Sequence, residues 1–328
     1  MSEPRLRRVT IRDVALEAGV SPSTVSNWLS RRSKHMAAST EAAVALAAEK
    51  LGYRPQVAAR VLRGQSSRVL GVIVPSIMNP SFPAIVRGAD DRAAADGYSL
   101  FLGNIDRHQD KAVALTQAMI DRGVDGVAFA FSVDDASQEA VVAADRSGLR
   151  TSLLVPKGAG TRGHRALVLD NEAAMRQVVG HLWGLGHRRI GVATNSHMTA
   201  NAPHRVSGLA EALRARKGGL PRELVFNDTA SPASFDELAE LEIGRRAGLS
   251  LLTLPSPPTA ICAVTDSIAV GLVRAARELG LGVPDDISVV GFGDLPASQV
   301  IEPALTTVAL DLYAIGQSLV ELLLEAEV

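Results

Sequence analysis

The sequence predicts a small all-α head with a helix-turn-helix, followed by an α/β core of two doubly wound parallel-sheet lobes. Charge divides the chain in the same way. The first 64 of its 328 residues hold 11 Lys and Arg against 5 Asp and Glu, whereas the rest hold 23 against 30. From Arg68 onward, apolar strand-like runs alternate with helical segments, which is typical of a parallel sheet covered on both faces. Roughly 260 residues is long for one such sheet, so two lobes are expected.

Composition indicates a folded intracellular protein. Apolar residues make up 47% of the chain, as in globular proteins. The single cysteine, Cys262 in the run AICAV, excludes a disulfide within the chain and is expected to be a small buried hydrophobe. The N-terminus MSEPRLRRVT lacks the apolar stretch of a signal peptide, and no apolar run approaches the ~18 residues of a membrane span. We therefore expect a cytoplasmic protein with no membrane partner.

The helix-turn-helix is predicted from residues around the stretch GVSPSTVSNWL. Thr10 and Asp13 form a Ser/Thr-x-x-acid start signal for a first helix, which Gly19 ends. Ser21 is a good N-cap for a second helix, and Pro22 takes its first position, where the missing N–H costs nothing. Two short helices joined by a glycine turn form a helix-turn-helix, although an ordinary helical hairpin has the same pattern.

The second helix, 22–29, is expected to present small polar side chains to DNA. Val20, Val25 and Leu29 share one face and are predicted to pack inward. The other face is expected to meet base edges, because side chains near the start of such a helix enter the major groove. That outward face carries Ser23, Thr24, Ser26 and Asn27.

A basic run and a short linker follow these helices. The run RRSKH, which ends at His35, is expected to hold phosphates. A third helix is predicted from about Thr40 to Leu51, and the segment QVAARVLRG comes after Tyr53-Arg54-Pro55. That segment is too short to be stable as a free helix. We therefore divide the chain into a DNA-binding domain (1–55), a linking segment (56–67) and a core (68–328).

The core is expected to bind a ligand between its lobes. Ligands of parallel sheets bind beyond the carboxyl ends of the strands. The loops after Val74, Ala193, Val264 and Phe292 are therefore expected to line the site. The candidate strands are VLGVIV (69–74), YSLFLG (98–103), GVAFAF (126–131), TSLLV (151–155), RIGVA (189–193), ELVFN (223–227), AICAV (260–264) and ISVVGF (287–292).

Several longer stretches share their motifs with one known family. They include TIRDVALEAGVSPSTVSNWL, LGYRPQVAARVLRG and RVLGVIVPSIMNPSF, with GHRRIGV, PTAICAVTD, DISVVGF and LTTV further along. The combination closely resembles the lactose-repressor family of bacterial transcription regulators over nearly the whole chain. The resemblance implies a homodimeric repressor that binds double-stranded operator DNA through its heads. It also implies a hinge helix and a periplasmic-binding-protein-like core, whose small effector modulates operator affinity.

The resemblance also implies DNA contacts along the head. Leu62 occupies the family's hinge-leucine position and is expected to enter the minor groove as a wedge that kinks the duplex. The alternative is that Leu62 packs the head onto the core. Asn27 replaces the common Arg after Thr-Val-Ser, so the family's usual operator pattern is not assumed. The implied contact residues are Thr10, Ser21, Pro22, Ser23, Thr24, Asn27, His35, Arg54, Ala58 and Leu62.

Arg205 and Asp266 match polar ligand-contact positions of the family. A guanidinium and a carboxylate can clamp vicinal hydroxyls or the polar edge of a base, so a sugar or nucleoside-like effector is expected. A cross-lobe ion pair or a solvated surface is the alternative. Phe82 is the candidate apolar wall, with Ser76 nearby, and Asp170 is a candidate for the entrance. The chain departs from the family's pattern near this site at Ser76, Thr229, Thr265 and Gly293.

Two other classes of function fit the sequence less well. A solute-binding protein would share the two-lobed core, but it needs an export signal and no basic helical head. No catalytic motif supports an enzymatic function. The sequence has neither a P-loop nor a Gly-x-Ser-x-Gly motif, and its histidines do not have the spacing of a zinc site. Neither a metal nor a cofactor is therefore expected. Residues 158–163 match GxGxxG but precede the strand-like run HRALVLD, and we interpret them as a loop between the lobes.

Overall fold

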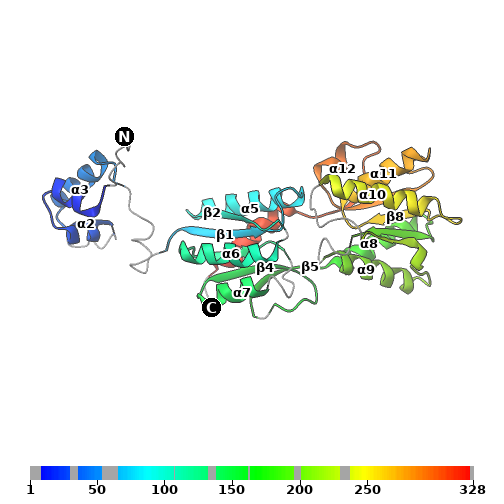
Figure 1. Ribbon diagram of the computed structural model, residues 1–328, viewed down its shortest axis with the longest axis horizontal. Coiled ribbons are helices and arrows are strands. Elements are labelled where there is room, and N and C mark those ends of the chain that lie inside the picture. The colour runs from blue at the N-terminus through cyan, green and yellow to red at the C-terminus, as the bar shows by residue number, and fades with distance from the viewer. Residues whose placement is uncertain are drawn as a thin grey trace, which may run out of the picture. The chain divides into compact units, whose positions relative to one another are not determined.

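A computed structural model divides the chain into two compact units, Met1–Ser67 and Arg68–Val328 (Figure 1). It describes residues 9–29, 36–53, 66–106, 108–131, 138–161, 163–195, 201–229 and 237–325. The first unit has a hydrophobic core of its own, separate from those of the second. Within the described residues, no helix is long and apolar enough to cross a membrane.

The described part of the first unit contains three helices: α1 (Ile11–Glu17), α2 (Pro22–Leu29) and α3 (Ala38–Lys50). Val14, Val25 and Val44, one from each helix, are fully buried and lie at the centre of its core. Val20 and Leu29 pack against this cluster, as the sequence predicted. The buried residues of this small core are all valine or alanine, and larger side chains such as Ile11, Trp28 and Tyr53 pack around them.

Side-chain caps place the helix ends where the sequence predicted them. The Asp13 carboxylate accepts hydrogen bonds from the Thr10 backbone N–H at 2.8 Å and from the Thr10 hydroxyl at 2.7 Å. The Ser21 hydroxyl accepts a hydrogen bond from the Thr24 N–H at 3.1 Å, so α2 begins at the proline that follows the cap. Gly19 has φ +66°, a left-handed conformation that glycine adopts without strain.

The first lobe of the second unit is a parallel sheet in the order β2-β1-β3-β4-β5. Helices α5 and α13 pack on one face, and α6 and α7 pack on the other (Figure 1). Leu70 and Val72 of β1 point to the first face, whereas Ile73 points to the second. Burial on both faces explains why the strands are continuous apolar runs. The bounds are β1 (Val69–Val74), α5 (Ser81–Ala95), β2 (Ser99–Asn104), α6 (Gln109–Asp121), β3 (Gly126–Phe129), α7 (Gln138–Arg146), β4 (Arg150–Pro156), β5 (Arg165–Leu169) and α13 (Leu312–Leu324).

The second lobe is also a parallel sheet, in the order β10-β9-β8-β6-β7. Helices α8 and α9 pack together, as do α10 and α11 (Figure 1). Cys262 is buried in this lobe, and burial raises the pKa of its thiol to about 12, which suits a small hydrophobe. The bounds are α8 (Asn171–Gly184), β6 (Ile190–Thr194), α9 (Asn201–Ala215), β7 (Val225–Asn227), α10 (Glu237–Leu252), β8 (Ala260–Ala263), α11 (Asp266–Glu278), β9 (Ser288–Gly293), α12 (Pro296–Val300) and β10 (Thr306–Ala309).

The chain crosses between the lobes from β5 into α8 and from β10 into α13. Each of these helices begins at an aspartate that caps it. Asp170 accepts a hydrogen bond from the Ala173 N–H, and Asp311 accepts one from the Ala314 N–H, both at 2.9 Å. Two parallel lobes joined in this way confirm the predicted fold class.

Four details of the predicted core were wrong. The GxGxxG segment does not join the lobes, because it lies between β4 and β5, which pair in the sheet of the first lobe. The run ELVFN is a strand only at Val225–Asn227, since residues Arg222–Leu224 form a 3-10 turn. The run GVAFAF is a strand only over Gly126–Phe129. The strand β10 was not among the predicted strands, because its TTVA sequence is short and only partly buried.

Glycines allow two helix pairs to approach closely. A Cβ added at Gly316 on α13 would lie 1.9 Å from the Ile85 carbonyl oxygen on α5, and one at Gly88 would lie 2.0 Å from the Tyr313 carbonyl oxygen. In the second lobe, a Cβ at Gly244 on α10 would lie 2.0 Å from the Ile268 carbonyl oxygen on α11. Backbone atoms cannot turn away as a flexible side chain can, so these positions require glycine.

We expect Gly316→Ala to lower the free energy of unfolding by about 1–3 kcal/mol or more, because the new methyl group forces α5 and α13 apart. Urea denaturation followed by circular dichroism measures this. The matched control is Gly184→Ala on α8, where an added Cβ meets nothing within 4 Å. That variant should be neutral or stabilised by up to about 1 kcal/mol through helix propensity. Equal midpoints for the two variants would contradict the packing argument.

Candidate DNA-binding surface and effector site

The outward face of α2 is polar, as predicted. Ser23 and Asn27 are exposed, whereas Val25 between them is fully buried. The Ser21 hydroxyl lies 2.6 Å from the Ser23 hydroxyl and 2.9 Å from that of Thr24. These linked hydroxyls cluster at the start of the helix, where they can exchange their mutual hydrogen bonds for base edges or phosphates.

Other predicted DNA contacts are placed only in part. Thr10 is exposed at the start of α1, where its hydroxyl is bonded to Asp13. His35, Arg54, Ala58 and Leu62 lie outside the described residues. Their contacts, and the hinge helix with its leucine wedge, stay predictions.

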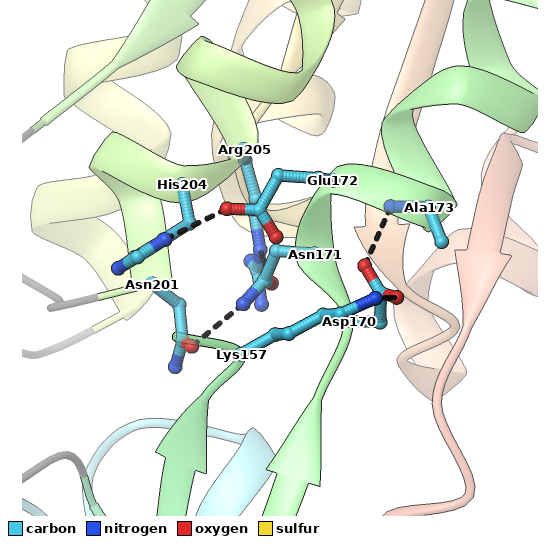
Figure 2. Close-up of polar contacts among 8 residues, drawn as sticks. All are labelled: Lys157, Asp170, Asn171, Glu172, Ala173, Asn201, His204 and Arg205. Carbon is cyan, nitrogen blue, oxygen red and sulfur yellow. Dashed lines mark hydrogen bonds and ion pairs between the residues drawn. The ribbon is translucent and has the colours of Figure 1, made fainter. Parts of the chain in front are cut away.

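Arg205 is the centre of a buried polar cluster in the second lobe. Its side chain reaches from α9 to the carboxyl end of β8, and only 7% of the residue is exposed. The guanidinium donates to the Asn171 Oδ1 at 2.9 Å and to the Val264 carbonyl oxygen, and it stacks 3.6 Å from the centre of the Phe292 ring. Figure 2 shows Arg205 behind Asn171, between α8 and α9. Helices α8 and α9 and the carboxyl ends of β8 and β9 therefore meet at this residue, at strand ends where a ligand was expected.

Burial lowers the pKa of Arg205 to about 9, because the guanidinium has lost its water, and the carboxylates of Glu240 and Asp266 oppose that shift. Arg205 therefore stays charged at neutral pH in a poorly hydrated place. Hydrogen bonds from such a group to a ligand are stronger than those made at the surface. A cation held in this way is suited to binding hydroxyl, carbonyl or anionic oxygens.

Asp266 is more enclosed than the sequence suggested. It is the first residue of α11 and is fully buried. One carboxylate oxygen accepts a hydrogen bond from the Leu295 N–H at 2.7 Å, and the other accepts one from the Thr307 hydroxyl. A Cβ added at Gly291 would lie 2.3 Å from Oδ1, so a glycine makes room for this carboxylate. Burial raises its pKa, whereas these hydrogen bonds lower it. Asp266 thus ties β9, β10 and α11 together behind Arg205.

The remaining predicted site residues lie in the first lobe or at the crossing from β5 into α8. Ser76 is buried after β1, and its hydroxyl accepts a hydrogen bond from the Met78 N–H at 3.2 Å. Phe82 is half-buried on α5 and packs against the core of the first lobe. Asp170 caps α8 and forms an ion pair with Lys157 at 2.5 Å, which lowers the pKa of its carboxyl (Figure 2). The alternative of an Arg205–Asp266 ion pair across the lobes does not fit, because both residues belong to the second lobe.

Sequence reasoning missed several polar residues of the cluster. Asn171 is buried beside Arg205 and donates to the Asn201 Oδ1 at 2.9 Å (Figure 2). Glu172 and His204 form a second link between α8 and α9, at 2.8 Å. Asn171 directly follows Asp170 after a strand, so polar residues just past strand ends were a signal that could have found it.

A separate pocket of about 260 Å³ lies at the amino ends of β9 and β10. Its walls are mainly leucine, valine and proline side chains, with His181, Ser288 and Thr306 as polar members. None of the predicted site residues lines it. Within the described residues, no group of three or more His, Cys, Asp and Glu side chains could hold a metal ion.

A helix-turn-helix head and a two-lobed core with a buried arginine at its strand ends define a class of protein: a DNA-binding regulator with a ligand-binding core. The family model described as "Bacterial regulatory proteins, lacI family" matches residues 10–56. The model described as "Periplasmic binding protein-like domain" matches residues 179–326.

Similar proteins agree with these matches. The HTH-type transcriptional repressor CytR of Escherichia coli K12 is 32% identical over 320 residues, which cover 96% of this chain and 89% of that one. Catabolite control protein A of Priestia megaterium is 31% identical over 96% of this chain and 91% of its own. A crystal structure of the lac repressor dimer bound to operator and the anti-inducer ONPF is 27% identical, with a TM-score of 0.81 over 97% of this chain and 92% of that one.

The chain therefore belongs to the lacI family of bacterial regulatory proteins. It is a sequence-specific DNA-binding transcriptional regulator, and not an enzyme, whose core binds an effector that modulates operator affinity. The solute-binding alternative is excluded, because family membership extends over the helix-turn-helix as well as the core.

Proposed function

We propose that this regulator is a cytoplasmic homodimeric repressor that binds a two-fold operator and responds to a sugar or nucleoside-like effector. We assign these functions to three segments: a DNA-binding domain (1–55), a hinge and linker (56–67) and an effector-binding core (68–328). The outward Ser23 and Asn27 of α2, beside a buried Val25, are the observation that carries the DNA-binding half.

A dimer follows from the size of the head. One α2 helix covers only a few base pairs, so useful specificity in a genome requires two heads on a two-fold site. The similar lac repressor structure is itself a dimer on its operator. In such a dimer the paired 56–67 segments lie near the two-fold axis, where Leu62 is placed to kink the duplex.

The effector half of the proposal rests on Arg205. Its guanidinium is held by Asn171, Val264 and Phe292, while Asp266 and Glu240 supply negative charge nearby. Amides, carboxylates and one guanidinium together favour a neutral ligand rich in hydroxyls or amide-like edges. We assign Arg205 and Asp266 as the polar clamp. Ser76 and Phe82 contribute from the first lobe and Asp170 from the crossing into α8.

Selection from a random DNA duplex library with the full chain tests the DNA-binding half. We expect a two-fold symmetric sequence. Asn27→Ala should change the preferred base at one position in each half-site, at a cost of about 1–3 kcal/mol for the original base. The matched control is Ser39→Ala, an exposed polar residue of α3 and not of α2, which should leave the preference unchanged. An asymmetric consensus would refute the dimer, and an unchanged preference in the Asn27 variant would refute the assigned reading face.

A further inference from the structure

Glu240 on α10 joins the two lobes. The residue is only 5% exposed, and its Oε1 accepts a hydrogen bond from the Asn79 Nδ2 at 3.2 Å. Asn79 belongs to the loop after β1 in the first lobe and is 8% exposed. The other oxygen, Oε2, accepts a hydrogen bond from the Thr265 hydroxyl of the second lobe at 2.8 Å. One buried carboxylate therefore binds a donor from each lobe.

Both donors are oriented by their own lobe. The Asn79 Oδ1 accepts a hydrogen bond from the Ser81 N–H at 3.0 Å, which turns the amide NH₂ toward Glu240. The Thr265 hydroxyl caps α11 by accepting from the Ile268 N–H at 3.2 Å, which leaves its proton for Glu240. Both donors to Glu240 are thus oriented within their own lobes, which lowers the entropy cost of forming the contact between the lobes.

Charge makes this contact costly to lose. A carboxylate buried in protein is stable only while hydrogen bonds and nearby positive charge replace its water. Arg205 supplies that charge, since Glu240 is the carboxylate that most opposes the lowering of the Arg205 pKa by burial. When the lobes separate, Glu240 loses its hydrogen bond from Asn79. Water or a hydrogen-bond donor of a ligand must then replace that bond.

We propose that the Asn79–Glu240 hydrogen bond is a latch that holds the lobes closed and thereby sets operator affinity. The hydrogen bond itself joins two residues of the core and involves no residue of the DNA-binding domain. The effect on operator affinity rests on the proposed function. An effector whose hydrogen-bond donors reach the Glu240 carboxylate competes with Asn79 for it. Glu240 is then the residue through which effector binding changes the closure of the lobes.

Three variants test the latch. Asn79→Asp sets one carboxylate against another and should open the lobes. The double variant Asn79→Asp with Glu240→Gln restores a reversed amide–carboxylate bond, and the glutamine oxygen still accepts from Thr265. Glu242→Gln is the matched control, because it removes the same charge from α10 at an exposed residue that pairs with Arg245 of its own helix.

Distances between the lobes are measured in the full chain without ligand by double electron–electron resonance. Spin labels are placed at exposed pairs, Lys111 with Glu211 and Asp90 with Ser250, each pair joining one lobe to the other. Cys262 is buried and remains in place. Thermal unfolding of each variant confirms that it is folded.

We expect Asn79→Asp to shift the closed-to-open ratio by about tenfold toward open, the change expected for loss of a hydrogen bond to a buried charge. The double variant should return toward the wild-type distances, and Glu242→Gln should match wild type. A wild-type distance distribution in Asn79→Asp, or a double variant as open as the single, overturns the latch. Operator affinity is measured separately on the selected duplex. Open lobes with unchanged operator affinity would overturn the coupling alone, whereas failure to bind any selected duplex would count against the proposed function.

Discussion

A fragment that begins at Arg68 is expected to lose at least about a thousandfold in operator affinity while its core stays folded. The two units are compact and have separate cores, so removal of residues 1–67 leaves the second unit whole. What remains has 23 basic and 30 acidic residues, and this negative balance repels DNA. Fluorescence anisotropy with the selected duplex measures the loss, and circular dichroism with thermal unfolding checks the fold of the core.

The control for this truncation removes only residues 1–8, which include three arginines but none of the three helices. That shorter deletion should keep the sequence preference, and it should weaken binding to all duplexes and flatten the salt dependence if those arginines contact phosphates. Undiminished binding by the fragment that begins at Arg68 would show that DNA is bound by the core and would refute the assigned DNA-binding surface.

The sequence was most informative where local chemistry decides the structure. Ser21 and the proline after it fix the start of α2, and the Thr10–Asp13 pair fixes the start of α1, so these elements were predictable. Long apolar runs buried on both faces, such as that at Val69–Val74, were equally clear. The short edge strand Thr306–Ala309 was not, because partial burial leaves little apolar pattern and pairing with β9 supplies the missing order.

The effector site was predictable only in part, for a physical reason. Arg205 and Asp266 were found through the family resemblance, because they follow strands in motifs of fixed spacing. Glu240 and Asn79 are 161 residues apart. Asn79 lies in the motif stretch RVLGVIVPSIMNPSF, but Glu240 lies in none of the quoted motifs, and nothing in the sequence pairs the two. Their bond depends on how the two lobes meet, which no local pattern encodes. The same is true of Asp266, whose carboxylate is enclosed by Leu295 and residues of β9 and β10 that come later in the chain.

Arg205→Ala is expected to abolish the response to effector. Hydrogen bonds to charged groups contribute about 1.5–3 kcal/mol each, so loss of the guanidinium should weaken effector binding by at least about tenfold for each bond it makes. The change lies in the second unit, outside the helix-turn-helix. Calorimetry with a panel of sugars and nucleosides first identifies a ligand, and the variant is then titrated with that compound.

Two further variants separate recognition from packing. Arg205 also fills space against Phe292 and satisfies Asn171 and the Val264 carbonyl, so its loss will lower stability as well. Arg205→Lys keeps the charge but loses the planar fork, and it should bind the ligand weakly while unfolding closer to wild type. The matched control, Arg214→Ala, removes an exposed arginine from the same helix and should change neither property.

Coupling gives the decisive measurement for Arg205. If the effector changes operator affinity by a given factor, the operator must change effector affinity by the same factor, typically about 5- to 150-fold. In wild type, the factor by which effector changes operator affinity should therefore equal the factor by which operator changes effector affinity. Arg205→Ala should show a factor near one in both, because a ligand that no longer distinguishes the two states cannot shift them. If a folded Arg205→Ala variant keeps both its ligand affinity and the coupling between ligand and operator, the effector binds elsewhere in the core and Arg205 is not part of its site.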